Sequence, residues 1–227
     1  FSSKIPASEH TAENHIYWIN KVLKELKLKE LVYAGQDWGG PIGMGALSLS
    51  PELLKGAVLL NTGFNAPKVN ADLSPAHALV KTPVIGELLL EVIFSIFERL
   101  KSVQGNPDSW TSEVAELYGR PVYESGNSKA PLAMMRMVPD GPNHPSTPSM
   151  RRVEEYVNTL EIPAEIVWGE NDPILGRGLP IMQQNFPNAR LTKTTAGHFL
   201  QEEVPNEIAE ALIRVIEEIT DTQTQKN

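Results

Sequence analysis

The sequence predicts an α/β fold in which parallel strands alternate with covering helices. Apolar residues 31–34 lead into a Gly-rich turn, which opens the helix-compatible residues 42–47. Two more short apolar runs, at 57–60 and 166–168, are typical of buried strands. Residues 205–219 repeat apolar side chains at helical spacing. Strands that alternate with helices in this way favour a mostly parallel sheet.

The remaining core elements follow along the chain. A first helix is expected over residues 12–26, because apolar side chains recur at helical spacing from Ile16 to Leu26. A further strand is expected at 189–192, before the last helix. The predicted order is helix, strand, turn, helix, strand, long insertion, strand, helix, strand, helix. The polar tail at 221–227 is expected to be frayed.

The insertion separates the strand that ends at Leu60 from the strand that starts near Ile166. It is too long for a loop and lacks an alternating strand pattern. Its very apolar residues 83–97 predict a helix of a covering cap. A membrane span is disfavoured, because Glu87 and Glu91 interrupt the run, which falls short of the roughly 20 residues that a span needs.

A second helix of the cap is expected over residues 111–117, with Asp108 or Ser109 as its N-cap. The predicted organisation is a single α/β core interrupted by this helical cap. The core and cap are expected at these residues: 1–65 (core), 66–155 (cap) and 156–227 (core).

Residues 35–40, Gly-Gln-Asp-Trp-Gly-Gly, lie between a predicted strand and a predicted helix. A small-x-nucleophile-x-small pattern in that place is typical of the nucleophile elbow of α/β-hydrolases, which raises one side chain above the sheet. Gly35 and Gly39 are expected there because a strained turn leaves no room for Cβ atoms. The same pattern also occurs in ordinary turns, which are rich in Gly and Asp for backbone reasons.

The residue at the nucleophile position is Asp37, where the usual residue is Ser. A carboxylate attacks an sp³ carbon that bears a leaving group, and it forms an ester that water must then break. Trp38 adds an indole N–H, which donates hydrogen bonds and accepts none. A donor beside the nucleophile suits a departing anion.

His198 is the candidate general base. It lies between a predicted strand and the last helix, where loops display catalytic side chains. A lone loop histidine is more often without a role. Of the five histidines, however, only His198 follows a strand end with Gly and apolar residues beside it.

Asp172 is the candidate acid that orients the histidine. It follows the predicted strand 166–168 and the exit turn at Gly169. The chain order nucleophile, acid, base is that of α/β-hydrolase triads. Asp172 could instead cap a helix or form an Asp-Pro turn, and Glu170 and Asn171 are nearby competitors for the acid role.

Together these residues resemble the haloalkane dehalogenase family of α/β-hydrolases. The match rests on Gly-Gln-Asp-Trp-Gly-Gly at 35–40, Trp-Gly-Glu-Asn-Asp-Pro at 168–173, Gly-His-Phe-Leu-Gln-Glu-Glu at 197–203, Ala-Pro-Leu-Ala at 130–133 and Arg-Met-Val-Pro at 136–139. The resemblance extends from about residue 1 to residue 219. The elbow motif is shared with soluble epoxide hydrolases, whereas Gln36 is more similar to the dehalogenases.

The resemblance implies hydrolytic dehalogenation of haloalkanes through a covalent ester on Asp37, with His198 as base, Asp172 as acid and Trp38 as halide donor. No metal and no organic cofactor are expected. The expected partners are a small apolar halogenated substrate, water and halide. An apolar pocket is expected from these side chains, each of which is also a plausible core residue: Phe64, Phe94, Phe97, Leu132, Met134, Met135 and Leu200.

Two departures from the family pattern stand out. Residues 1–6 resemble the loop after the fourth strand of the family, so an upstream segment or a second chain is expected to complete the sheet. That segment would carry the His-Gly motif of the oxyanion hole and, in many members, a second halide ligand. Trp110 is a weaker candidate for that ligand. Some members take the triad acid from the position of Asn61, but an amide cannot replace a carboxylate, which leaves Asp172.

Two other functions remain open. An epoxide hydrolase would use the same triad together with acid donors from the cap, for which Tyr118 and Tyr123 are available. A non-catalytic, hydrolase-like fragment is the third hypothesis. The residues that would precede Phe1 distinguish the first two, because His-Gly-Asn favours a dehalogenase and His-Gly-Phe an epoxide hydrolase.

Composition narrows the choice further. The chain has 227 residues, a hydrophobic content of 41% and a charged content of 21%, which are ordinary for a globular protein. The formal net charge of −8 and the absence of a long basic stretch disfavour nucleic-acid binding. The lack of Cys excludes a thiol nucleophile and disulfides. No signal peptide is visible, and a cytoplasmic location without membrane attachment is expected.

Overall fold

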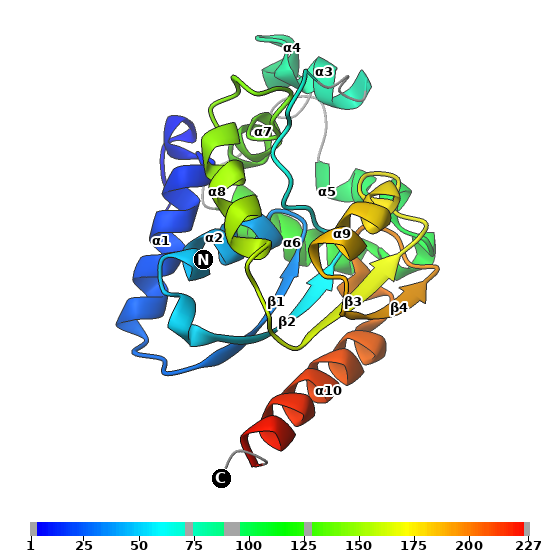
Figure 1. The fold of residues 1–227 in the computed structure, drawn as a ribbon. Helices are drawn as coiled ribbons and strands as arrows, with labels where there is room; N and C mark the ends of the chain where they lie inside the picture. The colour runs from blue at the N-terminus through cyan, green and yellow to red at the C-terminus, as the bar shows by residue number, and fades with distance from the viewer. Residues whose placement is uncertain (1–3, 71–74, 89–95, 125–128, 225–227) are drawn as a thin grey trace.

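Four parallel strands form the centre of the protein, in a computed structural model that describes residues 4–70, 75–88, 96–124 and 129–224. The strands lie side by side in chain order, β1–β2–β3–β4 (Figure 1). Their bounds are Leu31–Gln36 (β1), Leu54–Leu60 (β2), Ala164–Gly169 (β3) and Arg190–Thr194 (β4). All four predicted strands are therefore present, and the predicted parallel sheet is confirmed.

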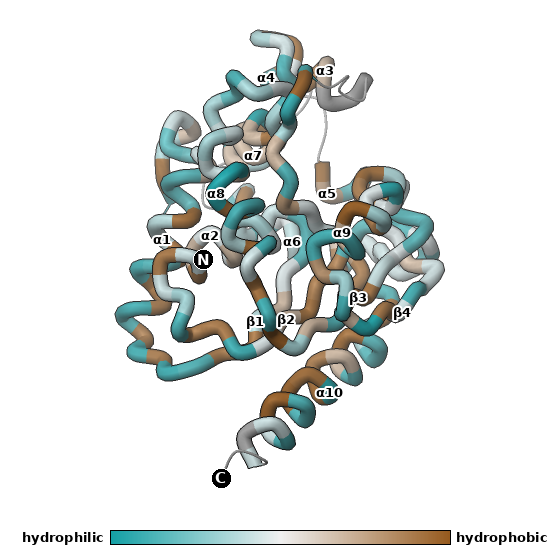
Figure 2. The backbone as a smooth tube through the Cα atoms, in the orientation of Figure 1, coloured by the Kyte–Doolittle hydropathy of each residue, from teal (hydrophilic) through white to brown (hydrophobic). Residues whose placement is uncertain are grey.

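Helices cover both faces of this sheet. One face carries α1 (Ala12–Glu25), α2 (Gly39–Ser48), α8 (Thr147–Val157) and α9 (Leu179–Asn185), and the other carries α10 (Pro205–Thr224). Successive strand residues point to opposite faces, so Leu59 packs with the first group and Val58 packs with α10. Figure 2 shows hydrophobic and hydrophilic residues alternating along α10, as expected of a helix with one buried face.

The ends of two predicted helices differ from expectation. The last helix continues to Thr224, beyond the predicted end at 219 and into the tail that was expected to be frayed. The helix predicted at 111–117 is α6 (Ser112–Tyr123). Its N-cap is Thr111, whose hydroxyl accepts the Val114 N–H, so the prediction of Asp108 or Ser109 is wrong.

The described part of the insertion between β2 and β3 is largely helical, and apart from α8 most of it lies beyond the carboxyl ends of the strands (Figure 1). The apolar run at 83–97 contains α4 (Ile85–Glu87) and the first two residues of α5 (Ile96–Arg99), and residues 89–95 lie outside the described part of the chain. The other short elements are α3 (Pro75–Lys81), α7 (Ala130–Arg136) and the 3₁₀ turns Ala7–Glu9, Pro51–Leu53, Leu100–Val103, Pro107–Ser109, Gly176–Gly178 and Leu200–Glu202.

The far end of the insertion packs on the core. Helix α8 contacts α1 and α2, and its Val153 and Val157 are buried in the same cluster as Met44 of α2. Part of the predicted cap thus contributes to the central core. Among the described residues, no helix has the length and apolar character that crossing a membrane requires.

Candidate active site

Asp37 projects from the sharp turn between β1 and α2. Its backbone is in the left-handed region, with φ of 48°, which is uncommon for a residue other than glycine. Hydrogen bonds hold this strained conformation: the Asp37 N–H donates to the Asn61 carbonyl at 3.0 Å, and the Thr62 hydroxyl donates to the Asp37 carbonyl at 2.7 Å. The turn is therefore fastened to the end of β2.

The glycines at the turn do not all serve the same purpose. A Cβ on Gly35 would lie 3.1 Å from the Gly40 Cα, and a Cβ on Gly40 would lie 1.9 Å from the Thr62 Oγ1. A Cβ on Gly39 would meet nothing closer than the Tyr33 hydroxyl at 3.8 Å. Gly35 and Gly40 are thus the sterically required pair, and the steric argument for Gly39 is wrong.

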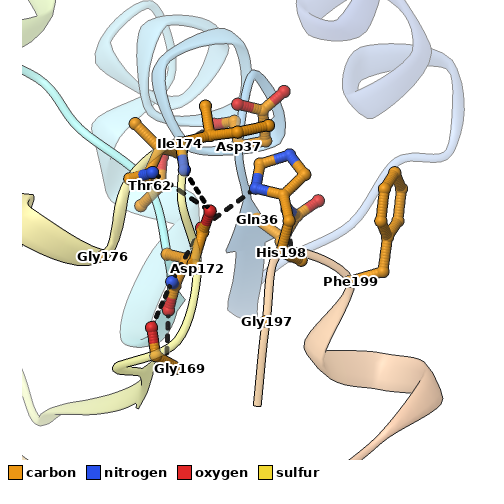
Figure 3. Close-up of polar contacts among 12 residues, drawn as sticks. Gln36, Asp37, Thr62, Gly169, Asp172, Ile174, Gly176, Gly197, His198 and Phe199 are labelled. Carbon is orange, nitrogen blue, oxygen red and sulfur yellow. Dashed lines mark hydrogen bonds and ion pairs between the residues drawn. The ribbon is translucent and has the colours of Figure 1, made fainter. Parts of the chain in front are cut away.

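His198 and Asp172 form a buried pair next to this turn. The His198 Nδ1 lies 3.0 Å from the Asp172 Oδ2. The other carboxylate oxygen of Asp172 accepts the N–H groups of Ile174 at 2.7 Å and Leu175 at 3.1 Å. Figure 3 shows the imidazole lying between the carboxyl groups of Asp172 and Asp37. Three residues that are far apart in the sequence are thereby brought together.

Asn61 links the strand ends beneath the pair. Its Nδ2 donates to the Asp172 Oδ2 at 2.8 Å and to the Gly169 carbonyl at 2.9 Å, and its Oδ1 accepts the Gly169 N–H at 2.8 Å. Asn61 is fully buried and has a φ of 24°. The sequence predicts only that the Asn61 amide cannot act as the triad acid. In the structure the Asn61 side chain instead holds the carboxylate of Asp172 in place.

The surroundings favour the charged forms of both partners. Burial disfavours the imidazolium form of His198, but the hydrogen bond to Asp172 and the charges of Asp37 and Asp172 outweigh this and raise the pKa of His198. Burial likewise opposes ionisation of Asp172. The hydrogen bonds from His198, Asn61 and Ile174 and the charge of His198 outweigh that effect and lower the pKa of Asp172. The pair is thus suited to hold a proton on the ring.

A cavity of about 610 Å³ opens onto Asp37, Trp38 and His198. This volume is in the range of small-molecule sites. Apart from Asp37 and His198, the described lining residues carry no ionisable side chain. Apolar residues predominate: Ile96, Phe97, Leu100, Met134, Met135, Val138, Ile174, Leu175, Ile181 and Met182.

The predicted pocket residues divide into two groups. Phe97, Met134 and Met135 line the cavity. Three others do not line it, because Phe64 and Leu200 are buried within the core clusters on the two faces of the sheet and Leu132 is buried in α7 beside a different cleft. Phe94 lies outside the described residues. The lining from Ile174 to Met182 was not predicted, although it directly follows Asp172.

The two tryptophan candidates differ in what their indole groups contact. Trp38 lines the cavity next to Asp37, and its Nε1–H has no hydrogen-bond partner within the described part of the chain. The Trp110 Nε1–H donates to the Phe97 carbonyl at 2.7 Å, and Trp110 lines a separate cleft. Its hydrogen bond argues against Trp110 as a halide donor.

Comparisons with known proteins agree with this geometry. Residues 1–205 match the α/β hydrolase fold family. A haloalkane dehalogenase of Psychrobacter cryohalolentis is 27% identical over 93% of this chain and 69% of its own length. A cis-3-alkyl-4-alkyloxetan-2-one decarboxylase of Shewanella oneidensis is 26% identical over 96% of this chain and 70% of its own length.

Solved structures give the same fold. The structure of a loop variant of haloalkane dehalogenase DbeA from Bradyrhizobium elkanii superposes with a TM-score of 0.84 at 16% identity, covering 100% of this chain and 80% of that chain. The structure of haloalkane dehalogenase DatA from Agrobacterium tumefaciens gives a TM-score of 0.79 at 20% identity, covering 96% of this chain and 77% of that chain.

The chain belongs to the α/β hydrolase fold family. Within that family its resemblance to the haloalkane dehalogenases, drawn above from the motifs, is confirmed by these relatives. The chain spans about two thirds of the length of the curated relatives that it matches.

Proposed function

We propose that this protein hydrolyses haloalkanes to an alcohol and halide through a covalent ester on Asp37. One observation carries the proposal: a carboxylate on a nucleophile elbow and a buried imidazole–carboxylate pair face the same apolar cavity. The similarity to haloalkane dehalogenases supports the carbon–halogen bond as the bond that is broken.

In the first step, a carboxylate oxygen of Asp37 attacks the carbon that bears the halogen. A carbon–oxygen bond forms and the carbon–halogen bond breaks, with its electron pair leaving on the halide. The Trp38 Nε1–H donates a hydrogen bond to the departing halide. The Asp37 carboxylate is a stronger nucleophile in an apolar cavity than in water, and the hydrogen bond from Trp38 to the halide is also stronger there. The reason is that the cavity replaces bulk solvent around the charges.

In the second step, water attacks the carbonyl carbon of the ester. His198 accepts a proton from the water at Nε2, while Asp172 holds Nδ1 and stabilises the imidazolium. The acyl–oxygen bond breaks, the alcohol leaves after taking a proton, and the Asp37 carboxylate is restored. The sum is haloalkane plus water giving alcohol, halide and a proton. The residues supply this chemistry without a metal or organic cofactor.

An epoxide hydrolase would require an acid that protonates the epoxide oxygen. None of the five tyrosines of the chain is among the described residues that line the cavity. The hydroxyl of Tyr118 donates to Glu202 at 2.6 Å, and Tyr123 lines another cleft. The lining therefore favours the haloalkane over the epoxide. The intact triad geometry also favours an active enzyme over a non-catalytic fragment.

The oxetanone decarboxylase among the relatives provides a second candidate reaction, in which a strained ring loses carbon dioxide. A panel of three substrates separates the candidates: a brominated alkane, a terminal epoxide and a cis-dialkyl oxetanone. Release of bromide with formation of the alcohol is the expected outcome. Diol formation, or release of carbon dioxide, from the other substrates without bromide release would reject the proposal.

We propose the division into a core of residues 1–65 and 156–227 and a cap of residues 66–155. Helix α8, at the end of this cap, packs on the core. A cytoplasmic location remains a prediction.

We further propose that the open edge of β1 pairs with another strand, from an upstream segment or from a second chain. Among the described residues β1 is an edge strand, and α1 and its C-cap residue expose Tyr17, Ile19, Val22 and Leu26. Unpaired edges and exposed apolar surface promote aggregation. Residues 1–227 with this edge unpaired are expected to unfold at a lower temperature than the same residues with the edge paired. Equal unfolding temperatures would contradict the edge proposal.

A further inference from the structure

The loop that carries His198 lies directly against a segment of the insertion, residues 103–106. The His198 N–H donates to the Val103 carbonyl at 2.8 Å. The next residue, Phe199, donates its N–H to the Gln104 Oε1 at 3.0 Å. The loop is thus held from outside the sheet, by a part of the chain that is about 95 residues away in sequence.

One carboxylate fastens the two segments together. Glu203 accepts the N–H of Gly197, the residue before His198, at 2.8 Å. It also accepts the N–H groups of Gly105 at 3.0 Å and Asn106 at 2.6 Å. Charged acceptors make stronger hydrogen bonds than neutral ones, and this acceptor serves three backbone donors from both segments.

The two segments pack closely at this contact, with no room for a Cβ at either glycine. A Cβ on Gly105 would lie 2.1 Å from the Thr195 carbonyl oxygen, and a Cβ on Gly197 would lie 2.3 Å from the Val103 carbonyl oxygen. Two backbones therefore approach each other without intervening side chains. A shift of residues 103–106 would move the backbone of His198.

Aromatic side chains extend the contact between the His198 loop and the insertion. Phe199 lines the cavity and packs against Trp110 at a centroid distance of 4.8 Å, and against the His198 ring at 5.1 Å. The Trp110 indole N–H in turn donates to the carbonyl of Phe97, another lining residue. The wall of the cavity and the imidazole are therefore joined through a continuous set of contacts.

We infer that Glu203 is a positioning residue for His198, and that it couples the insertion to the water-dependent step of the reaction. This inference rests on the proposed function. Attack by Asp37 needs no proton transfer, whereas opening of the ester needs the imidazole in place. Loss of the Glu203 contacts should therefore slow hydrolysis of the ester and spare its formation.

The test is Glu203→Gln in the full chain. The amide replaces one acceptor oxygen with a donor that opposes a backbone N–H. With a brominated alkane, bromide release in the first turnover should stay within about twofold of the unmodified protein. Ester hydrolysis should slow by roughly 10- to 100-fold, as expected of a displaced catalytic group. Intact-mass measurement should then find the alkyl adduct accumulating.

Glu202→Gln is the matched control, because the Glu202 carboxylate accepts from the Tyr118 hydroxyl and, among the described residues, has no hydrogen bond to residues 103–106 or to the backbone of His198. It should leave both steps unchanged. Gln104→Met, which removes the acceptor for the Phe199 N–H, should reproduce the selective slowing if Glu203→Gln fails to fold.

NMR titration of the His198 ring provides a readout that needs no substrate. Its raised pKa should fall toward the ordinary value in Glu203→Gln as the Asp172 contact loosens. An unchanged titration together with unchanged hydrolysis would overturn the inference, as would an equal loss of both steps. Absence of bromide release from the unmodified protein would instead reject the proposed function and leave the titration to decide the inference.

Discussion

The two carboxylates of the site and its imidazole are held by different parts of the molecule. Asp37 follows β1 and Asp172 follows β3, and both are hydrogen-bonded to Asn61 at the end of β2. The backbone N–H of Asp37 donates to the Asn61 carbonyl, and the carboxylate of Asp172 accepts from the Asn61 side chain. The backbone of His198 is held instead by Val103 of the insertion and by the side chain of Gln36.

This difference separates the two chemical steps of the proposed reaction. The nucleophile is placed by the ends of the strands, so its position in the first step depends on the core, and the insertion contributes to that step only through the lining of the cavity. The base is placed by the sheet and the insertion together, so the second step depends on both. Substitutions in the core and in the insertion should therefore produce different kinetic defects.

The largest effect is expected from Asp37→Asn. An amide is a poor nucleophile, and it retains the size of the side chain that it replaces. Halide release should fall by about 10⁴-fold or more, the scale of losing a catalytic nucleophile. Glu170→Gln provides the control, because Glu170 is exposed and pairs with Lys193 outside the cavity. Substantial halide release by a pure, sequenced Asp37→Asn sample would remove Asp37 from the nucleophile role.

Asp172→Asn should slow ester hydrolysis by roughly 10²- to 10⁴-fold, because an amide cannot balance the imidazolium charge. Ester formation should continue, so the adduct should accumulate on Asp37. Glu170→Gln is the control, since Glu170 pairs with exposed Lys193. Near-normal turnover of Asp172→Asn would transfer the acid role to another residue.

Two adjacent glycines test whether the turn is built as described. A Cβ on Gly40 would lie 1.9 Å from the Thr62 Oγ1, so Gly40→Ala should destabilise the protein by about 1–3 kcal/mol and impair halide release. The Cβ of Gly39→Ala would meet no atom closer than 3.8 Å, so this variant should change stability by less than about 0.5 kcal/mol. Thermal unfolding of both variants measures the change in stability. Equal losses would mean that the close approach of Gly40 to Thr62 does not matter.

The pH dependence of the two steps should differ. His198 must be neutral to accept a proton, and its pKa lies above the ordinary 6.5, so ester hydrolysis should decline as the pH falls through that raised value. Ester formation should show no such decline. Rapid-quench rates between about pH 5 and 9, a range that brackets the ordinary histidine pKa, would measure both. A hydrolysis midpoint below 6.5 would contradict the described surroundings of His198.

The raised pKa of His198 affects the stability of the fold in the opposite direction from ester hydrolysis. Because the folded pKa of His198 is raised, its contribution to stability is fully present below the unfolded pKa and is lost as the pH rises through the folded pKa. Asp172 behaves in the reverse sense: its pKa is lowered, so its contribution is present above its unfolded pKa and is lost as the pH falls through the folded pKa.

The sequence predicted what depends on local pattern. Four strands, the elbow at Asp37 and the strand-end placement of Asp172 and His198 follow from short apolar runs and the turns after them. Parallel strands bring their carboxyl ends to one edge of the sheet, so the chemistry at those ends converges without knowledge of the contacts.

What could not be predicted depends on contacts between distant segments. Nothing in the residues around Gly40 shows that Thr62 will lie against it, and nothing near Glu203 reveals the backbone of Gly105. The predicted pocket failed at Phe64 and Leu200 for a related reason: an apolar side chain that follows a strand or precedes a helix fits a core as well as a cavity, and only packing distinguishes them.

The most direct test of the account is to trap the intermediate. A His198→Phe variant, incubated with a brominated alkane, should release about one bromide per protein molecule and then stop, because the ester forms and water cannot open it. Peptide mass analysis should find the added alkyl group on Asp37. Continuous bromide release by this variant, or an alkyl group on any other residue, would contradict the central claim that Asp37 is the nucleophile and His198 the base.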